Sequence, residues 1–185
     1  MQHERSRPDS HVSAVAKRRL DVSGFTGIQG RWTVVARREG KILWEDEIEN
    51  TVVDAGLNEL LGVTLTRETQ TNTWHILVTS GAPTPNAADT MASHAGWEEY
   101  TGFSDATRGV WVGSRDATAQ ATNPTAVQYT FNATGTVGGA GLVSTNSLGG
   151  STGTLYAVGV FTGGSKVLNS GDTLDVTATF TNTPV

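Results

Sequence analysis

The sequence contains no cysteine, which excludes several kinds of chemistry at once. Without thiols there are no disulfides, no thiolate metal ligands and no cysteine nucleophile. Apolar segments are also short, and none approaches the roughly 20 residues that a membrane-spanning helix needs. Residues 1–20 include basic side chains but lack the apolar core of a secretory signal. We therefore expect a protein that is made in a cytoplasm, has no membrane partner, and is stabilised by packing and assembly.

Positive charge is scarce in this acidic chain and gathers near its start. The net charge is −5 at pH 7. The first 20 residues hold five basic side chains, namely Arg5, Arg7, Lys17, Arg18 and Arg19. With Glu4 and Asp9 included, the net charge of residues 1–20 is +3, which leaves a net charge of −8 on the remainder of the chain. Five cations without interleaved aromatic residues are a weak case for nucleic-acid binding. Docking on an acidic protein surface and a merely solvated tail fit the charge as well.

The first part of the chain shows no sustained period. It contains Pro8 and two glycines, so we expect residues 1–29 to form an extended arm ahead of one β domain at residues 30–185. Some apolar side chains in the arm lie near helical spacing, at Val12, Val15, Ala16 and Leu20. This spacing allows a short helix. Because the arm has no core of its own, we expect it to contact a neighbouring subunit or another partner.

Threonine and glycine dominate the composition and indicate short strands joined by turns. The chain holds 22 glycines, well above an average share, and threonine packs well on a pleated surface. Apolar residues alternate with polar ones in two segments, at Trp32, Val34 and Ala36 and again at Leu174, Val176, Ala178 and Phe180. Shorter apolar runs, at 74–79, 110–112, 127–133, 137–144 and 155–161, predict further strands. We predict an all-β fold, an antiparallel sandwich or open barrel of the jelly-roll kind.

Two hairpins are expected within this pattern. Glu39-Gly40 is a turn signal between a basic segment at 31–37 and an acidic segment at 41–49, whose charges can pair across the strands. Ser170-Gly171-Asp172 marks the turn of a final hairpin. Between the hairpins, residues 81–97 carry proline, glycine and asparagine and predict an irregular loop.

One amphipathic helix is predicted between Asn50 and Gly62. Its apolar stripe has members at i, i+4, i+7 and i+8, namely Val53, Leu57, Leu60 and Leu61. Asn50 or Thr51 suits the N-cap, and Gly62 suits the position after the C-cap. We expect the stripe to pack on the sheet.

Motifs that could carry catalysis or metal binding are isolated and incomplete. The stretch Gly149-Gly150-Ser151-Thr152-Gly153 matches the elbow pattern of serine hydrolases, yet neither a helix nor a histidine follows it, so we expect a loop. No two of the four histidines show ligand spacing. His75 fits a buried strand, and His94, ahead of Glu98 and Glu99, fits a structural hydrogen bond in a loop. The sequence therefore predicts neither an enzyme nor a bound metal or cofactor.

Four aromatic residues crowd one loop-rich span, namely Trp97, Tyr100, Phe103 and Trp111. Rings at this density suit an interface between subunits, where aromatic side chains are enriched. They equally suit sugar stacking or the edge of the core. We predict an interface between subunits.

Four segments, taken together in their order and spacing, resemble a family of virion structural proteins of tailed bacteriophages. They are 50–61 (NTVVDAGLNELL), 88–99 (ADTMASHAGWEE), 152–157 (TGTLYA) and 170–177 (SGDTLDVT), and Arg108 follows the second. The resemblance extends over residues 50–181, most of the chain. It implies a structural role in the virion and no catalytic residues.

Two roles are open for a protein of this kind. A capsid decoration (cement) protein binds the outside of the assembled shell, commonly as a trimer with the major capsid protein as its partner, and stabilises the lattice by mass action. A tail or appendage component would bind its neighbours or a host glycan, but the long repeats typical of fibres are absent from this sequence. We expect the decoration role, a homotrimer, and a location on the capsid exterior.

Overall fold

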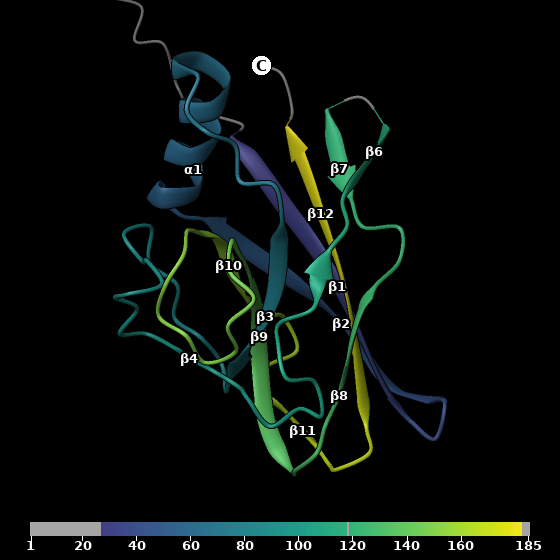
Figure 1. Cartoon of the computed structure of the whole chain (residues 1–185). Coiled ribbons are helices and arrows are strands. Elements are labelled where there is room, and N and C mark those ends of the chain that lie inside the picture. Colours follow the sequence, from purple (N-terminus) through teal and green to yellow (C-terminus); the bar gives the residue numbers. More distant parts are fainter. Residues whose placement is uncertain (1–26, 118, 183–185) are drawn as a thin grey trace, which may run out of the picture.

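The computed structural model describes residues 27–117 and 119–182, which form one curled β-sheet with a single helix at one end (Figure 1). Twelve mostly antiparallel strands make up the sheet, and it curls into a half-barrel. The predicted all-β fold is therefore confirmed, in its open-barrel form. Residues 1–26 of the predicted arm, with all five of its basic side chains, lie outside the described residues.

The elements follow one another along the chain as β1 Ile28–Arg38, β2 Lys41–Val52, α1 Asp54–Leu61, the π-helical turn Gly62–Thr66, β3 Trp74–Ser80, β4 Glu98–Glu99, β5 Val110–Trp111, β6 Ser114–Ala117, β7 Gln120–Thr122, β8 Val127–Thr130, β9 Gly135–Val143, β10 Leu155–Phe161, β11 Lys166–Leu168 and β12 Thr173–Asn182. Across the sheet the strand order is β4-β3-β9-β10-β2-β1-β12-β7-β6. Three short strands lie off this path, since β11 pairs with β9, β5 with β3 and β8 with β12. Neighbours in the sheet therefore come from distant parts of the chain.

β1 and β2 form the hairpin that the turn signal predicts. Glu39 and Gly40 join them with φ angles of 50° and 77°, both in the left-handed region. A two-residue turn of this kind twists in the same sense as the strands, and glycine enters that region without steric cost. A register shift between Ala36 and Arg37 marks a bulge just before the turn.

Two of the three paired basic side chains of β1 bond to β12 or to the turn before it, and not to the acidic strand β2, so the predicted charge pairing is wrong for Arg37 and Arg38. Arg38 donates two hydrogen bonds to Asp172 in the turn before β12, at 2.7 and 2.8 Å, and Arg37 donates to Asp175 of β12 at 3.1 Å. Arg31 does face β2, where its Nε lies 3.9 Å from Glu47, but both side chains are exposed. The reason is topological, because β1 has a neighbour on each side and the sequence indicates only the hairpin partner.

The prediction of a final hairpin is wrong, because the strands on either side of its turn do not pair with each other. Gly171 has a φ of 88°, yet β11 pairs with β9 while β12 pairs with β1, β7 and β8. The carboxylate of Asp172 accepts the backbone N–H of Asn169 at 2.7 Å and the Arg38 guanidinium, which holds the turn. The strands before and after this turn therefore join different neighbours.

The helix begins and ends later than predicted. β2 continues to Val52, so α1 starts at Asp54 without a side-chain cap. Neither Asn50 nor Thr51, the two predicted N-cap residues, caps the helix. Gly62 has a right-handed φ of −57° and does not end the helix. The π-helical turn continues to Thr66, and Arg67 then takes the left-handed φ, 63°.

The predicted apolar stripe of the helix is wrong in part. Gly56 is the point of closest approach to the sheet, since a Cβ there would lie 2.3 Å from the backbone oxygen of Tyr156. This approach turns Leu60 toward the sheet and leaves Leu57 and Leu61 exposed. A glycine, and not the leucine stripe, therefore determines which face of the helix is covered.

The core lies inside the curl of the sheet. The inward-facing residues of β1 and β12 are fully buried, and they include Trp32, Val34, Ala36, Leu174, Val176 and Ala178. Burial of each valine- or leucine-sized side chain contributes roughly 1.5–3 kcal/mol. The alternation predicted for these two strands is thereby confirmed.

Candidate functional site

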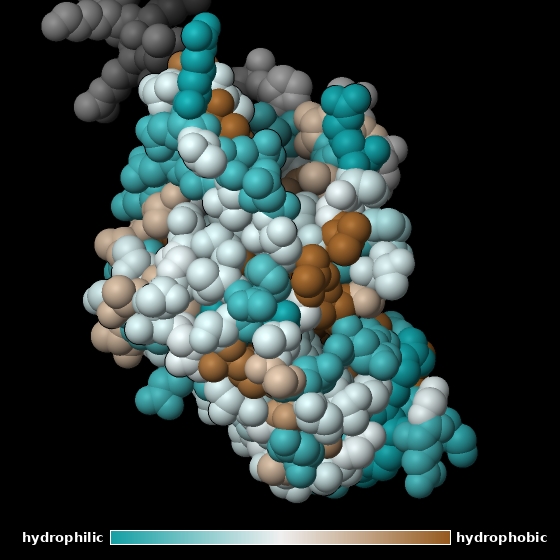
Figure 2. Space-filling model, viewed as in Figure 1, coloured by the Kyte–Doolittle hydropathy of each residue, from teal (hydrophilic) through white to brown (hydrophobic). Residues whose placement is uncertain are grey.

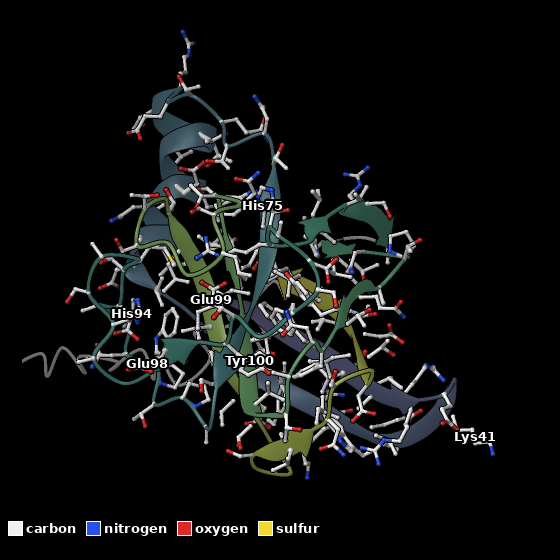
Figure 3. All side chains as sticks on the ribbon, turned by 60° about the horizontal axis from the view of Figure 1, so that its bottom comes forward. Lys41, His75, His94, Glu98, Glu99 and Tyr100 are labelled. Atoms are coloured by element: carbon white, nitrogen blue, oxygen red, sulfur yellow. The ribbon has the colours of Figure 1, made fainter. Side chains whose placement is uncertain are left out.

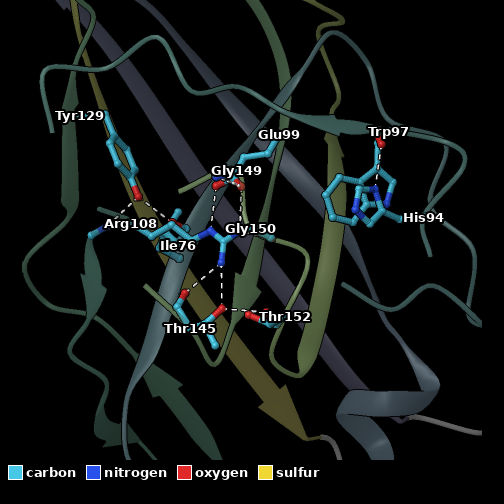
Figure 4. Close-up of polar contacts among 11 residues, drawn as sticks. Ile76, His94, Trp97, Glu99, Arg108, Tyr129, Thr145, Gly149, Gly150 and Thr152 are labelled. Atoms are coloured by element: carbon cyan, nitrogen blue, oxygen red, sulfur yellow. Dashed lines mark hydrogen bonds and ion pairs between the residues drawn. The ribbon is translucent and has the colours of Figure 1, made fainter. Parts of the chain in front are cut away.

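Arg108 and Glu99 form a buried ion pair behind the loops that follow β3 and β9 (Figure 4). Arg108 Nε and Nη2 donate to the two carboxylate oxygens at 2.8 and 2.7 Å, and the two side chains are 0% and 6% exposed. The guanidinium also donates to the backbone oxygens of Thr145 at 3.0 Å and Gly150 at 2.9 Å. Glu99 accepts the backbone N–H of Gly149 at 2.8 Å. The ion pair therefore connects the two loops.

This ion pair is fully bonded within the chain. The guanidinium also donates to the Thr145 hydroxyl at 3.0 Å, so all five of its N–H donors are used. A cavity of about 330 Å³ adjoins the pair, beside His94, Glu98 and Ser151. Within the described ranges, no group of three or more His, Asp or Glu side chains could hold a metal ion. A ligand in this cavity would have to displace existing bonds to reach either charge, so the pair is built to hold loops together.

His94, Trp97 and Asp89 form one bonded cluster in the central loop, residues 81–109. The His94 and Trp97 rings stack with centres 3.9 Å apart, and His94 Nδ1 donates to the Trp97 carbonyl oxygen at 2.9 Å. Trp97 Nε1 donates to Asp89 at 3.0 Å. Figure 3 shows His94 on the outer loop, whereas Glu99 lies toward the middle of the fold. The structural hydrogen bond predicted for His94 is confirmed.

His75 lies on β3 and is 7% exposed, as the buried-strand prediction requires. Its Nδ1 is buried and has no hydrogen-bond partner among the described residues. Burial lowers the pKa of His75, and the positive charge of Arg108 lowers this pKa further. His75 is therefore neutral at pH 7 and sits beside a permanent buried cation.

Two side chains close the open side of the half-barrel. The Tyr129 hydroxyl donates to the carbonyl oxygen of Ile76 at 2.6 Å and accepts the backbone N–H of Gly109 at 2.7 Å (Figure 4). Trp111 Nε1 donates to the carbonyl oxygen of Ala178 at 3.2 Å. Burial raises the pKa of Tyr129, so its hydroxyl stays a donor. These bonds join the β3 side of the sheet to the β12 side, beside the isolated backbone bridge between Phe103 and Phe131.

The four aromatic residues predicted as an interface do not form one surface. Trp97 and Phe103 are buried in two different clusters. Tyr100 packs edge-on against Phe103, with ring centres 5.0 Å apart, and Trp111 packs against Phe180 at 6.1 Å. Burial within one chain leaves Trp97 and Phe103 no surface to offer a second subunit. Of the predicted set, Tyr100 and Trp111 remain partly exposed.

An apolar groove, here called the aromatic groove, lies between α1 and the strands β3, β5, β7, β10 and β12. Its volume is about 220 Å³. Its floor is a row of four rings: Trp74 and Tyr156 have centres 5.3 Å apart, Tyr156 and Phe180 also 5.3 Å, and Phe180 and Trp111 6.1 Å. The four rings come from four separate strands, so no local pattern in the sequence could have predicted the groove.

The outer face of the helix carries an exposed row of leucines. Leu57, Leu61 and Leu65 lie four residues apart and are 38%, 51% and 75% exposed. Figure 2 shows hydrophobic atoms on the helix and a second hydrophobic patch over β5, where Val110 and Val112 are exposed. The sequence indicated the leucines, but as core residues.

No helix in the described part of the chain is long and apolar enough to cross a membrane. The sequence matches no known protein-family profile, and comparison with curated proteins finds no relative. The function therefore has to be inferred from the residue pattern and the geometry.

Proposed function

We propose that this protein is a capsid decoration protein of a tailed bacteriophage, bound to the outside of the shell. The resemblance of residues 50–181 to phage virion proteins supports this role. The observation that carries the proposal is the leucine row on α1 and the π-helical turn after it, because three exposed leucines one turn apart favour burial against another protein. The proposed partner is the major capsid protein, which is made in the same host cytoplasm.

The buried polar groups support a binding role rather than a catalytic one. Arg108 and Glu99 connect two loops, Tyr129 closes the half-barrel, and Asp172 holds a turn. Each of these groups bonds other parts of its own chain. A scaffold fixed in this way loses little conformational freedom when it binds, which favours affinity.

Mass action explains how such binding would stabilise a particle. A protein that binds the closed lattice and not the separate subunits raises the stability of the lattice. Packaged DNA repels itself and pushes outward, so contacts that bridge shell subunits oppose rupture. We propose a homotrimer, which presents three copies of one contact surface; a standard interface buries about 1,200–2,000 Å². The basic arm would add a further, salt-dependent contact with a neighbouring subunit or the shell.

A tail or appendage component that binds a host glycan is the alternative. Stacking on a sugar needs exposed ring faces. Burial removes Trp97 and Phe103 from the aromatic platform that would have served this purpose. The alternative therefore has less support than the decoration role.

The test compares phage particles with and without the protein. Particles that lack it should assemble, yet release DNA at a lower temperature and on milder osmotic shock. Adding purified protein should restore resistance in proportion to occupancy. A variant with the leucine row replaced, by Leu57→Ser, Leu61→Ser and Leu65→Ser, should bind and restore poorly. The matched control replaces three exposed apolar residues elsewhere, by Ile42→Ser, Leu43→Ser and Val167→Ser, and should act like the wild type.

Three results would contradict the proposal. Depleted particles that are equally robust but fail to attach to cells would favour the tail alternative. Equal particle binding by the two serine variants would exclude the leucine row as the contact. In sedimentation at micromolar concentration, a monomer both free and on particles would contradict the trimer.

A further inference from the structure

The described chain begins close to the aromatic groove. Gly30 of β1 pairs with Phe180, whose ring forms part of the groove floor. Gly27 lies three residues earlier, about 10 Å away at the rise of a strand. The segment that precedes Gly27 therefore starts beside the groove.

We propose that the aromatic groove binds apolar side chains of the same chain's N-terminal segment, residues 11–25. The segment contains seven apolar residues, namely Val12, Ala14, Val15, Ala16, Leu20, Val22 and Phe25. Their near-helical spacing over the first ten positions would place several of them on one face. Such a face fits a groove that has a row of rings as its floor.

The size of the groove favours side chains over a small molecule. Sites for drug-sized ligands usually enclose about 300–1,000 Å³, whereas this groove has about 220 Å³. A volume of this size accommodates one or two leucine- or phenylalanine-sized side chains. A peptide segment can supply such side chains one after another along the groove.

The charges of the groove and of the segment are opposite. Glu59 lines the groove, and Asp54 and Glu68 lie on the same helix and just after it, where Arg67 is the single cation of residues 54–68. The segment carries three consecutive cations at residues 17–19, between apolar residues, against one carboxylate, Asp21. Their attraction would fall with added salt, because exposed charges are screened.

The short connection favours docking within one chain over docking between two chains. A binding segment held on a short tether has an effective concentration on the order of millimolar. A second copy at micromolar concentration competes at a large disadvantage. Docking of residues 11–25 leaves the preceding residues, with Arg5 and Arg7, available for a partner. The inference concerns the free chain and does not rest on the proposed function.

A fluorescent label tests this contact in the full-length protein. The chain has no cysteine, so one introduced cysteine carries a single label. A bimane attached to Ser13→Cys would contact Trp74 or Trp111 in the docked segment, and contact with tryptophan quenches bimane. The same label on Ser6→Cys, outside the segment, is the control. We expect weaker emission from position 13, with recovery to the control level when Trp74→Phe and Trp111→Phe remove the quenchers but keep the rings.

A second pair of variants changes the segment alone. Val12→Asp with Leu20→Asp should abolish the quenching, because an apolar groove does not accept carboxylates. Val12→Ile with Leu20→Met should retain it, because apolar side chains of similar size replace one another well. Both pairs leave the described β domain unchanged, and circular dichroism would verify the fold.

Three outcomes would each contradict a different part of the proposal. Equal emission from labels at positions 13 and 6 would overturn the docking. Quenching that disappears on dilution, or on mixing with excess unlabelled chain, would overturn docking within one chain and assign the groove to a second copy. Quenching that survives both tryptophan substitutions would contradict the groove as the binding place.

Discussion

The hydroxyl of Tyr129 on β8 donates a hydrogen bond to the carbonyl oxygen of Ile76 on β3, at 2.6 Å, although the two strands are not neighbours in the sheet. The Tyr129 hydroxyl oxygen also accepts the backbone N–H of Gly109, at 2.7 Å. Tyr129, together with Trp111, therefore joins the two borders of the half-barrel.

Replacing this tyrosine should destabilise the fold. Tyr129→Phe keeps the ring but leaves the Ile76 carbonyl and the Gly109 N–H without their partner. Leaving buried polar groups unsatisfied costs about 1–3 kcal/mol. The free energy of unfolding in urea should fall by that amount. Tyr100→Phe, which removes an exposed hydroxyl bonded to Ala133 at 3.1 Å, is the control and should cost less. An equal loss in both variants would contradict the closing role of Tyr129.

Breaking the buried ion pair should be more damaging than breaking an exposed one. Arg108→Met leaves Glu99 buried without its partner, and removal of one member of a buried pair typically costs about 3–5 kcal/mol. Arg31→Met breaks the exposed pair with Glu47 and should leave the unfolding midpoint nearly unchanged. Chemical unfolding of the two variants gives the comparison. A small effect of Arg108→Met would show that the loops do not depend on this pair.

Acidification should destabilise the protein through His75. Its folded pKa lies below the ordinary value of 6.5, mainly because of burial. The unfolded chain therefore takes up the proton first, and the free energy of unfolding should fall as the pH drops below 6.5 toward the lowered pKa. His75→Gln should flatten this part of the profile, measured by urea unfolding from about pH 8 to about pH 5. An unchanged slope in the variant would exclude His75 as the cause.

Asp172 should affect the stability of the protein in a separate, more acidic pH range. Its hydrogen bond to Arg38 lowers the pKa of Asp172 below the ordinary 3.8, so its contribution to stability is present above that value. This contribution should be lost only as the pH falls through the lowered pKa. Asp172→Asn should remove the corresponding slope below about pH 4 and leave the range near pH 6 unchanged. A changed slope near pH 6 would contradict this assignment.

Two glycines in the helix should respond oppositely to alanine. A Cβ on Gly56 would lie 2.3 Å from the backbone oxygen of Tyr156, so Gly56→Ala should push the helix off the sheet at about 1–3 kcal/mol. A Cβ on Gly62 would meet the flexible carboxylate of Glu68, which can move aside. Gly62→Ala should therefore be neutral or gain up to about 1 kcal/mol from helix propensity. Thermal unfolding distinguishes the two, and a stabilising Gly56→Ala would contradict the close packing.

Features that depend on residues near one another in the chain were predictable. Alternation in β1 and β12 placed Trp32 and Leu174 inside, and both are fully buried. Glu39 and Gly40 were recognisable as a turn because few residues tolerate its left-handed backbone. The ion pair was not predictable, because Arg108 and Glu99 lie nine residues apart in an irregular connection, and the loop after β9 completes their bonding.

The sequence by itself determined that the chain is all-β with one helix, because period, turn residues and composition act locally, and it left a sandwich or an open barrel as alternatives. The tertiary structure decided which side chains bond to each other and which face solvent. Arg38 bonds to Asp172, and not to the acidic strand beside it, because β12 lies against β1. Leu57 faces solvent because Gly56 comes closest to the sheet. Such choices depend on contacts between residues far apart in the chain, and those contacts exist only once the whole sheet has formed.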